Sequence, residues 1–155
     1  MKAASKNAFA FGSTSFCLVD IETTGLSPQG HEITEIAAIR VDERFGIVSE
    51  MSRLVRTTQP VPWHITQLTG ISDALLRTKG IELRRALEET WQFVEGTPSF
   101  AHNARFDRGF LDAHAERSAM PFRFPLECSI PVFKRLIPGR KGYGLPVLAA
   151  ALRVN

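Results

Sequence analysis

The stretch Leu18-Val19-Asp20-Ile21-Glu22-Thr23-Thr24-Gly25-Leu26 joins a short apolar run to two acidic residues and a glycine turn. An apolar run of this length, bounded by turn residues, predicts a buried β-strand over residues 16–21. Side chains alternate along a strand, so Asp20 and Glu22 project from the same face and can hold one cation between them. Acidic residues also occupy solvated strand ends, and the pair taken alone does not separate these two interpretations.

The segments around this strand predict a mixed α/β domain. Strands are expected at 32–41 and 47–56, and the short turn between them indicates an antiparallel meander of three strands. Apolar residues then recur at helical spacing, with two short apolar steps among the helices. We expect helices at 63–69, 73–78, 83–94, between 101 and 118, 131–136 and 145–152, and strands at 98–101 and 126–130. This order predicts a central sheet flanked by helices.

The composition is typical of one folded domain. The chain has 155 residues, of which 44% are apolar, and this is enough to bury a core. Its formal charge of +3 permits a polyanionic partner without requiring one. Cys17 and Cys128 lack the spacing of a paired-cysteine metal site, so we interpret both as buried, reduced thiols.

Neither a membrane span nor a secretion signal is predicted. Every apolar run is shorter than the roughly 18 residues that cross a bilayer. The first residues also lack the basic start and long apolar stretch of a signal peptide. We therefore expect a cytoplasmic protein, with a flexible tail at residues 1–15 and a single domain at 16–155.

A third acidic residue, Asp107, follows the predicted fourth strand. If that strand lies beside the first one, Asp107 points toward the strand end that carries Asp20 and Glu22. Three carboxylates in proximity repel one another and raise one another's pKa values unless divalent cations neutralise them. Oxygen ligands of this kind select Mg²⁺ or Mn²⁺ over zinc. The three residues therefore predict a metal site.

Two segments of the chain resemble the motifs of a known group of nucleases. Residues 19–25 and 101–107 resemble the first two motifs of the DEDD superfamily of 3′–5′ exonucleases, in the branch similar to the proofreading epsilon subunit of bacterial DNA polymerase III. The segment 68–72 resembles the family's threonine-glycine-isoleucine segment. The resemblance covers nearly the whole chain from Phe16 onward, and the two motifs stand in the family's order.

The resemblance implies a ribonuclease H-like fold with a five-stranded sheet, in which three antiparallel strands precede two parallel ones. It implies that Asp20, Glu22 and Asp107 are the catalytic residues and bind two divalent cations, Mg²⁺ or Mn²⁺. It also implies a set of residues that bind the 3′ end of the substrate: Thr23, Thr24, Gly25, His102, Asn103 and Phe106.

Structural roles compete with several of these assignments. The two threonines also suit a turn that ends a strand, Asn103 suits a helix cap, and Phe106 suits the core. The basic segment 134–141 either holds phosphate or forms a solvated loop. The residues by themselves leave these alternatives open.

The third motif of the histidine-containing branch is not found in this chain. In that branch a histidine, which acts as general base, and an aspartate five residues later follow the segment that matches 143–154. The chain ends at Asn155, before these residues are due. We expect the complete protein to carry both soon after Asn155, so that the present domain stops before its last catalytic helix.

The resemblance implies a metal-dependent exonuclease that removes nucleoside monophosphates from the 3′ ends of single-stranded or frayed DNA. Proofreading and repair are the expected roles, and a DNA polymerase subunit is a possible partner. An RNA-trimming enzyme of the same fold is an alternative, since no residue reads the 2′-hydroxyl unambiguously. A non-catalytic module that binds nucleic acid or a polymerase is the alternative from a different class.

Overall fold

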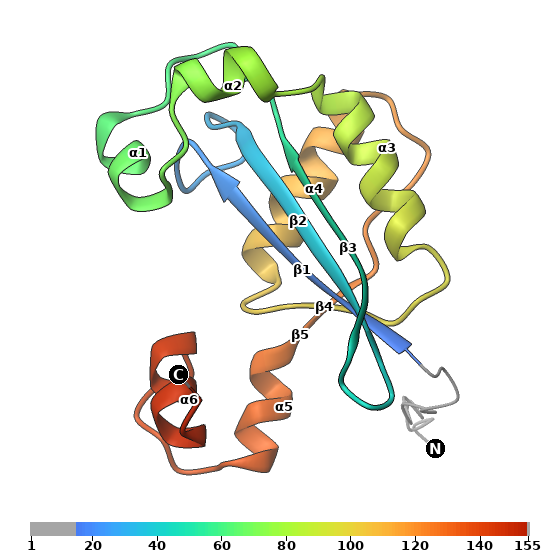
Figure 1. Cartoon of the computed structure of the whole chain (residues 1–155), viewed down its shortest axis with the longest axis vertical. Helices are drawn as coiled ribbons and strands as arrows, with labels where there is room; N and C mark the ends of the chain where they lie inside the picture. The colour runs from blue at the N-terminus through green and yellow to red at the C-terminus, as the bar shows by residue number, and fades with distance from the viewer. Residues whose placement is uncertain (1–14, 155) are drawn as a thin grey trace, which may run out of the picture.

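The computed structural model describes residues 15–154 and has a five-stranded sheet at its centre (Figure 1). The spatial order of the strands is β3-β2-β1-β4-β5. Neighbours among the first three are antiparallel, whereas β4 is parallel to both β1 and β5. The strands are β1 (Ser15–Thr23), β2 (Ile33–Asp42), β3 (Ile47–Leu54), β4 (Ser99–Ala101) and β5 (Leu126–Cys128). The predicted mixed sheet is confirmed, while all of the predicted tail except Ser15 lies outside the described residues.

The helices follow the predicted order. They are α1 (Trp63–Thr69), α2 (Asp73–Lys79), α3 (Leu83–Val94), α4 (Arg105–Arg117), α5 (Ser129–Leu136) and α6 (Leu145–Leu152). Ser72 caps α2 as its sequence position suggests, because its Oγ accepts a hydrogen bond of 3.2 Å from the backbone amide of Leu75.

Several predicted boundaries are wrong. Strand β1 extends to Thr23 rather than ending at residue 21, and β3 ends at Leu54 rather than at residue 56. The fifth strand ends at Cys128 rather than at residue 130, and the helix that follows begins at Ser129 rather than at residue 131. Cys128 pairs with Ala101, the last residue of β4, so β5 has no partner beyond this point. Pro131 stands in the first turn of α5, where its missing amide is not needed for a helical hydrogen bond.

Helices α3 and α4 cover one face of the sheet and contact each other there. The inward residues of β1, namely Cys17, Val19 and Ile21, are buried in this core. Trp91 on α3 belongs to the same layer and stacks on Phe122, with ring centroids 4.5 Å apart. The opposite face of β1 is more open, and Asp20 is exposed there. The helices thus leave free the face that carries the acidic pair.

Two further expectations need correction. Cys17 is buried as predicted, but Cys128 is only half-buried, and both are free thiols. The apolar residues Leu145, Leu148 and Leu152, whose helical spacing predicts α6 to bury one face, are buried only at Leu148, while Leu145 and Leu152 are 58% and 46% exposed. Helices α5 and α6 lie side by side beyond the end of the sheet (Figure 1), away from the α3–α4 layer. None of the helices between residues 15 and 154 has the length and apolar character needed to cross a bilayer.

Candidate active site

Asp20 and Glu22 occupy the open face of β1, as the alternation of side chains predicts. Asp20 is exposed and pairs in register with Ala37, whereas Glu22 is half-buried and pairs with Glu35. A register shift follows immediately, between Glu22 and Thr23. Such a bulge ends regular pairing and bends the strand. The bend therefore sets the two carboxylates just before the chain turns away from the sheet.

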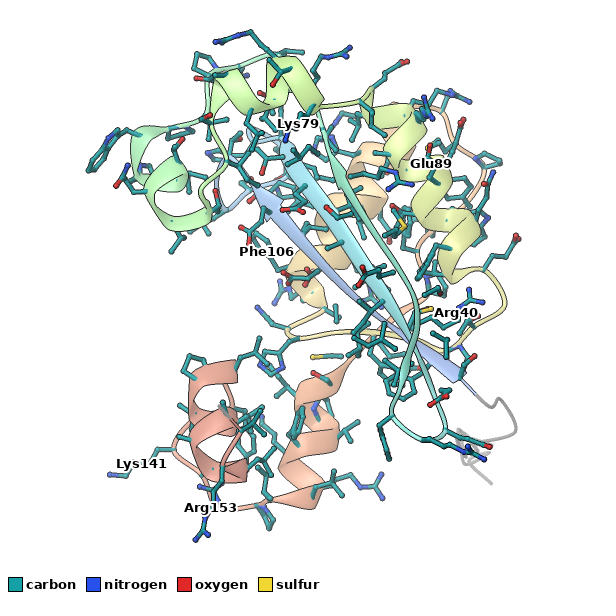
Figure 2. The ribbon with its side chains drawn as sticks, in the orientation of Figure 1. Arg40, Lys79, Glu89, Phe106, Lys141 and Arg153 are labelled. Carbon is teal, nitrogen blue, oxygen red and sulfur yellow. The ribbon has the colours of Figure 1, made fainter. Side chains whose placement is uncertain are left out.

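Asp107 approaches β1 from the edge of the strand that faces β4. Strand β4 pairs with β1 only at Cys17 and Leu18, so the edge of β1 beyond Leu18 is open on that side. Helix α4 begins there, and Figure 2 shows its Phe106 next to β1. Asp107 is 3% exposed as a residue, and its carboxyl lies close enough to the backbone amide of Ile21 to accept a hydrogen bond from it. Asp107 is thus held against the strand that carries the two other acids.

The three carboxylates disturb one another's ionisation. Burial raises the pKa of Asp107 to about 6, and the charges of Asp20 and Glu22 add to the shift, although backbone hydrogen bonds oppose it. The pKa values of Asp20 and Glu22 are also raised, chiefly by loss of hydration and further by acidic neighbours. Each charge makes the others less favourable, so a bound cation would relieve the repulsion.

Glu35 is an acidic residue of this site that sequence reasoning missed. Its charge raises the pKa values of both Asp20 and Glu22, and its Oε1 accepts a hydrogen bond of 2.6 Å from Ser52 Oγ. The alternation of β2 places Glu35 on the open face, but only the pairing register sets it opposite Glu22. No motif in the sequence marks it.

The donor set suits a hard divalent cation. Its acidic members supply only carboxylate oxygens, which Mg²⁺ and Mn²⁺ prefer. Within residues 15–154, however, no three His, Cys, Asp or Glu side chains converge into a finished metal cage. The acids interact electrostatically without closing on one point, so their side chains would have to draw together around a cation.

The hydroxyls of Thr23 and Thr24 are used inside the turn. Thr23 Oγ1 donates a hydrogen bond of 2.6 Å to the carbonyl of Gly25, and Thr24 Oγ1 accepts one of 2.9 Å from the amide of Glu32. Both side chains are buried, with exposed fractions of 7% and 5%. The geometry therefore supports the turn-forming role for these hydroxyls, and Leu26, which is 85% exposed, is the side chain that projects from the turn.

Gly25 is required because the ring of His31 packs against it. A Cβ added at Gly25 would overlap that ring, whereas one added at Gly30 in the same turn would meet no atom within 4 Å. We expect Gly25→Ala to lower the free energy of unfolding by about 1–2 kcal/mol, as overpacking does. Urea denaturation would measure this change in the free energy of unfolding, with Gly30→Ala as the matched control. Equal stability of the two variants would contradict the packing argument.

The residues of the second motif take different places. His102 Nδ1 lies 2.9 Å from Ser129 Oγ, while its buried Nε2 has no hydrogen-bond partner among the described residues. Asn103 is exposed and adopts a left-handed backbone with φ 63°, and the cap position of α4 belongs to Ala104. The alternative of Asn103 as the helix cap is thus wrong. Phe106 is half-buried against Phe110, with centroids 5.0 Å apart.

The basic segment 134–141 begins in the last turn of α5 and continues into the connection between α5 and α6. Arg140 and Lys141 line an open hollow there, together with Gly139 and Val147. Figure 2 shows Lys141 projecting away from the sheet. The structure therefore places this side chain away from Asp20 and its neighbours.

Comparisons with known proteins agree with this geometry. The model of the RNase T family, described as an exonuclease family, matches residues 18–155. The 3′-5′ exonuclease DinG of Bacillus subtilis (strain 168) is 32% identical over 145 residues, which are 90% of this chain and 15% of DinG. A PolC-type DNA polymerase III of Streptococcus agalactiae is 31% identical over 141 residues, or 90% of this chain and 10% of the polymerase. The chain therefore spans only a small part of these relatives.

Solved structures show the same fold. Exonuclease X in complex with 5′ overhanging duplex DNA is 30% identical with a TM-score of 0.66, and the match covers 90% of this chain and 74% of that one. E. coli exonuclease I in complex with a dA16 oligonucleotide gives a TM-score of 0.77 at 18% identity, covering 92% of this chain and 37% of the other. The second likeness concerns the fold alone.

Proposed function

Because this chain belongs to the RNase T family of exonucleases, we propose that it hydrolyses phosphodiester bonds at the 3′ ends of single-stranded or frayed DNA and releases nucleoside monophosphates. One observation carries the proposal. Asp20 and Glu22 on β1 and the buried Asp107 on α4 form a single electrostatically coupled set of acids at an open strand edge. A purely structural role leaves this repulsion without compensation.

In this proposal the acids bind two divalent cations, Mg²⁺ or Mn²⁺, which supply the positive charge that ionises the attacking water and stabilises the leaving oxygen. Asp20, Glu22 and Asp107 are the residues that would hold the cations, Asp20 and Glu22 from β1 and Asp107 from the first turn of α4. Asp107 is the most buried of the three, so its carboxylate keeps the most fixed position. Phosphoryl transfer of this kind depends on charge and placement, and no serine or cysteine nucleophile is needed.

The turn after β1 receives the last nucleotide. The exposed Leu26, next to Gly25 in this turn, offers an apolar contact for the terminal base. Asn103, exposed just before α4, and His102 Nε2, which has no hydrogen-bond partner among residues 15–154, provide polar contacts from the α4 side. Phe106 supports this side by packing on Phe110.

The relatives support a role in DNA metabolism. Matching segments occur within PolC-type polymerases and within the exonuclease DinG, and exonuclease X was solved with duplex DNA. Two roles fit these relatives: proofreading beside a polymerase, and independent trimming of DNA ends in repair. DNA is the proposed substrate over RNA on this basis.

The test is a nuclease assay with full-length protein. A 5′-labelled single-stranded DNA oligonucleotide with Mg²⁺ is expected to shorten stepwise from its 3′ end, and EDTA is expected to stop the reaction, since the acids alone cannot position the water. A 3′-phosphorothioate end serves as the control for direction. Faster degradation of RNA of the same sequence would favour the RNA-trimming alternative. No shortening, together with no specific Mn²⁺ binding, would identify a non-catalytic module.

A further inference from the structure

A second group of contacts links α4 to the turn that follows β1. His114 Nε2 lies 3.2 Å from the backbone carbonyl of His31, and the guanidinium of Arg117 donates a hydrogen bond of 2.8 Å to the carbonyl of Pro28. Both residues lie in the second half of α4, and neither belongs to the acidic set. The proposed reaction makes no direct use of them.

His114 is suited to a fixed structural contact. Its side chain is 5% exposed and stacks on Phe110, with ring centroids 6.0 Å apart and an interplanar angle of 16°. A carbonyl oxygen can only accept, so Nε2 must carry the hydrogen. Burial, and secondarily the charge of Arg117, lowers the pKa of His114 and keeps the ring neutral. His114 is thus a neutral donor aimed at the turn.

His31, whose carbonyl His114 contacts, also packs on Gly25 through its ring. The ring of His31 occupies the space where a Gly25 side chain would stand, and the amide of Ser27 lies 3.3 Å from its Nδ1. A shift of His31 would therefore move the backbone of the turn at Gly25. The contacts of His31 therefore fix the position of the segment 25–31 relative to α4.

Asp107 and His114 are seven residues apart on α4, so they lie on the same side of the helix after two turns. We propose that His114 and Arg117 are positioning residues that anchor the turn 25–31 to α4, so that one rigid helix sets both the Asp107 carboxylate and the nucleotide-binding turn. The nucleotide-binding role of this turn rests on the proposed function. The hydrogen bonds between α4 and the turn do not depend on it.

Kinetics of two loss variants, one conservative variant and a matched control test the anchoring. His114→Leu and Arg117→Gln are each expected to raise KM for a short DNA oligonucleotide about tenfold, the effect of losing one hydrogen bond, with kcat changed by less than about threefold. Mn²⁺ affinity is expected to stay unchanged, because the acids are not touched. His114→Gln keeps an amide donor and is expected to restore most of the lost affinity. Arg77→Gln, at an exposed arginine of α2, is the control and is expected to match the wild type.

Hydrogen exchange gives a readout that needs no activity. The amides of 25–31 are expected to exchange faster in His114→Leu, while the core amides of β1 keep their protection. Unchanged exchange in the turn, or an unchanged KM in both variants, would overturn the inference. A wild-type protein without nuclease activity would overturn the proposed function instead, and the exchange result would still decide whether α4 anchors the turn.

Discussion

Asp20→Asn is expected to reduce the rate of 3′ nucleotide release about a thousandfold or more, which corresponds to roughly 4 kcal/mol of lost transition-state stabilisation. The substitution keeps the size of the side chain and removes its charge. Asp20 has both other acids as electrostatic neighbours, since its charge raises the pKa values of Glu22 and Asp107. The loss of this carboxylate therefore weakens both cation positions at once.

Initial rates with a labelled oligonucleotide at saturating Mg²⁺ measure this effect. Glu50→Gln is the matched control, because Glu50 is an exposed acid on β3 of the same sheet. It is expected to keep the wild-type rate. The rate of Glu35→Gln should lie between those of Asp20→Asn and Glu50→Gln, since Glu35 influences Asp20 and Glu22 without lying on β1. Wild-type activity in Asp20→Asn would show that the reaction occurs at another site.

The second large effect concerns stability without metal. The pKa of Asp107 is raised from 3.8 to about 6 in the folded protein. Between these two values the folded state binds a proton that the unfolded state has lost. The stability contributed by protonated Asp107 is therefore complete below pH 3.8, falls as the pH rises through 6, and is absent above it. The full loss amounts to about 3 kcal/mol.

Asp107→Asn removes this loss, because the amide stays neutral at every pH and its oxygen can still accept the hydrogen bond from Ile21. In EDTA we expect the variant to be more stable than the wild type by up to about 3 kcal/mol above pH 6, with the difference disappearing near pH 4. Chemical denaturation across this pH range measures the difference. Equal stability at pH 7 would show that the buried carboxyl carries no unfavourable charge.

Bound metal is expected to reverse the order of stability of the wild type and Asp107→Asn. Mn²⁺ binds the folded state and is expected to stabilise the wild type in proportion to its occupancy, while Asp107→Asn gains much less. The wild-type gain should also diminish as the pH falls below about 6, where Asp107 takes up a proton. An equal gain in both proteins would exclude Asp107 as a ligand.

The order and approximate place of the early elements could be predicted because their signals are local, although β1 ends two residues later and β3 two residues earlier than predicted. The apolar run and glycine turn around β1, and the serine cap of α2, depend only on neighbouring residues. The end of β5 could not be predicted, since it is set by the length of its partner β4. The exposure of Leu145 and Leu152 likewise depends on where α6 lies relative to the sheet.

By itself, the sequence determined that Asp20 and Glu22 share one face of a strand, because alternation is a property of the backbone. It also indicated that Asp107 lies in the first turn of the helix that follows the fourth strand. Only the tertiary structure decided that Asp107 presses against Ile21, that Glu35 stands opposite Glu22, and that His114 holds the turn through His31. These contacts depend on strand register and on how α4 packs, and such long-range geometry leaves no local pattern in the chain.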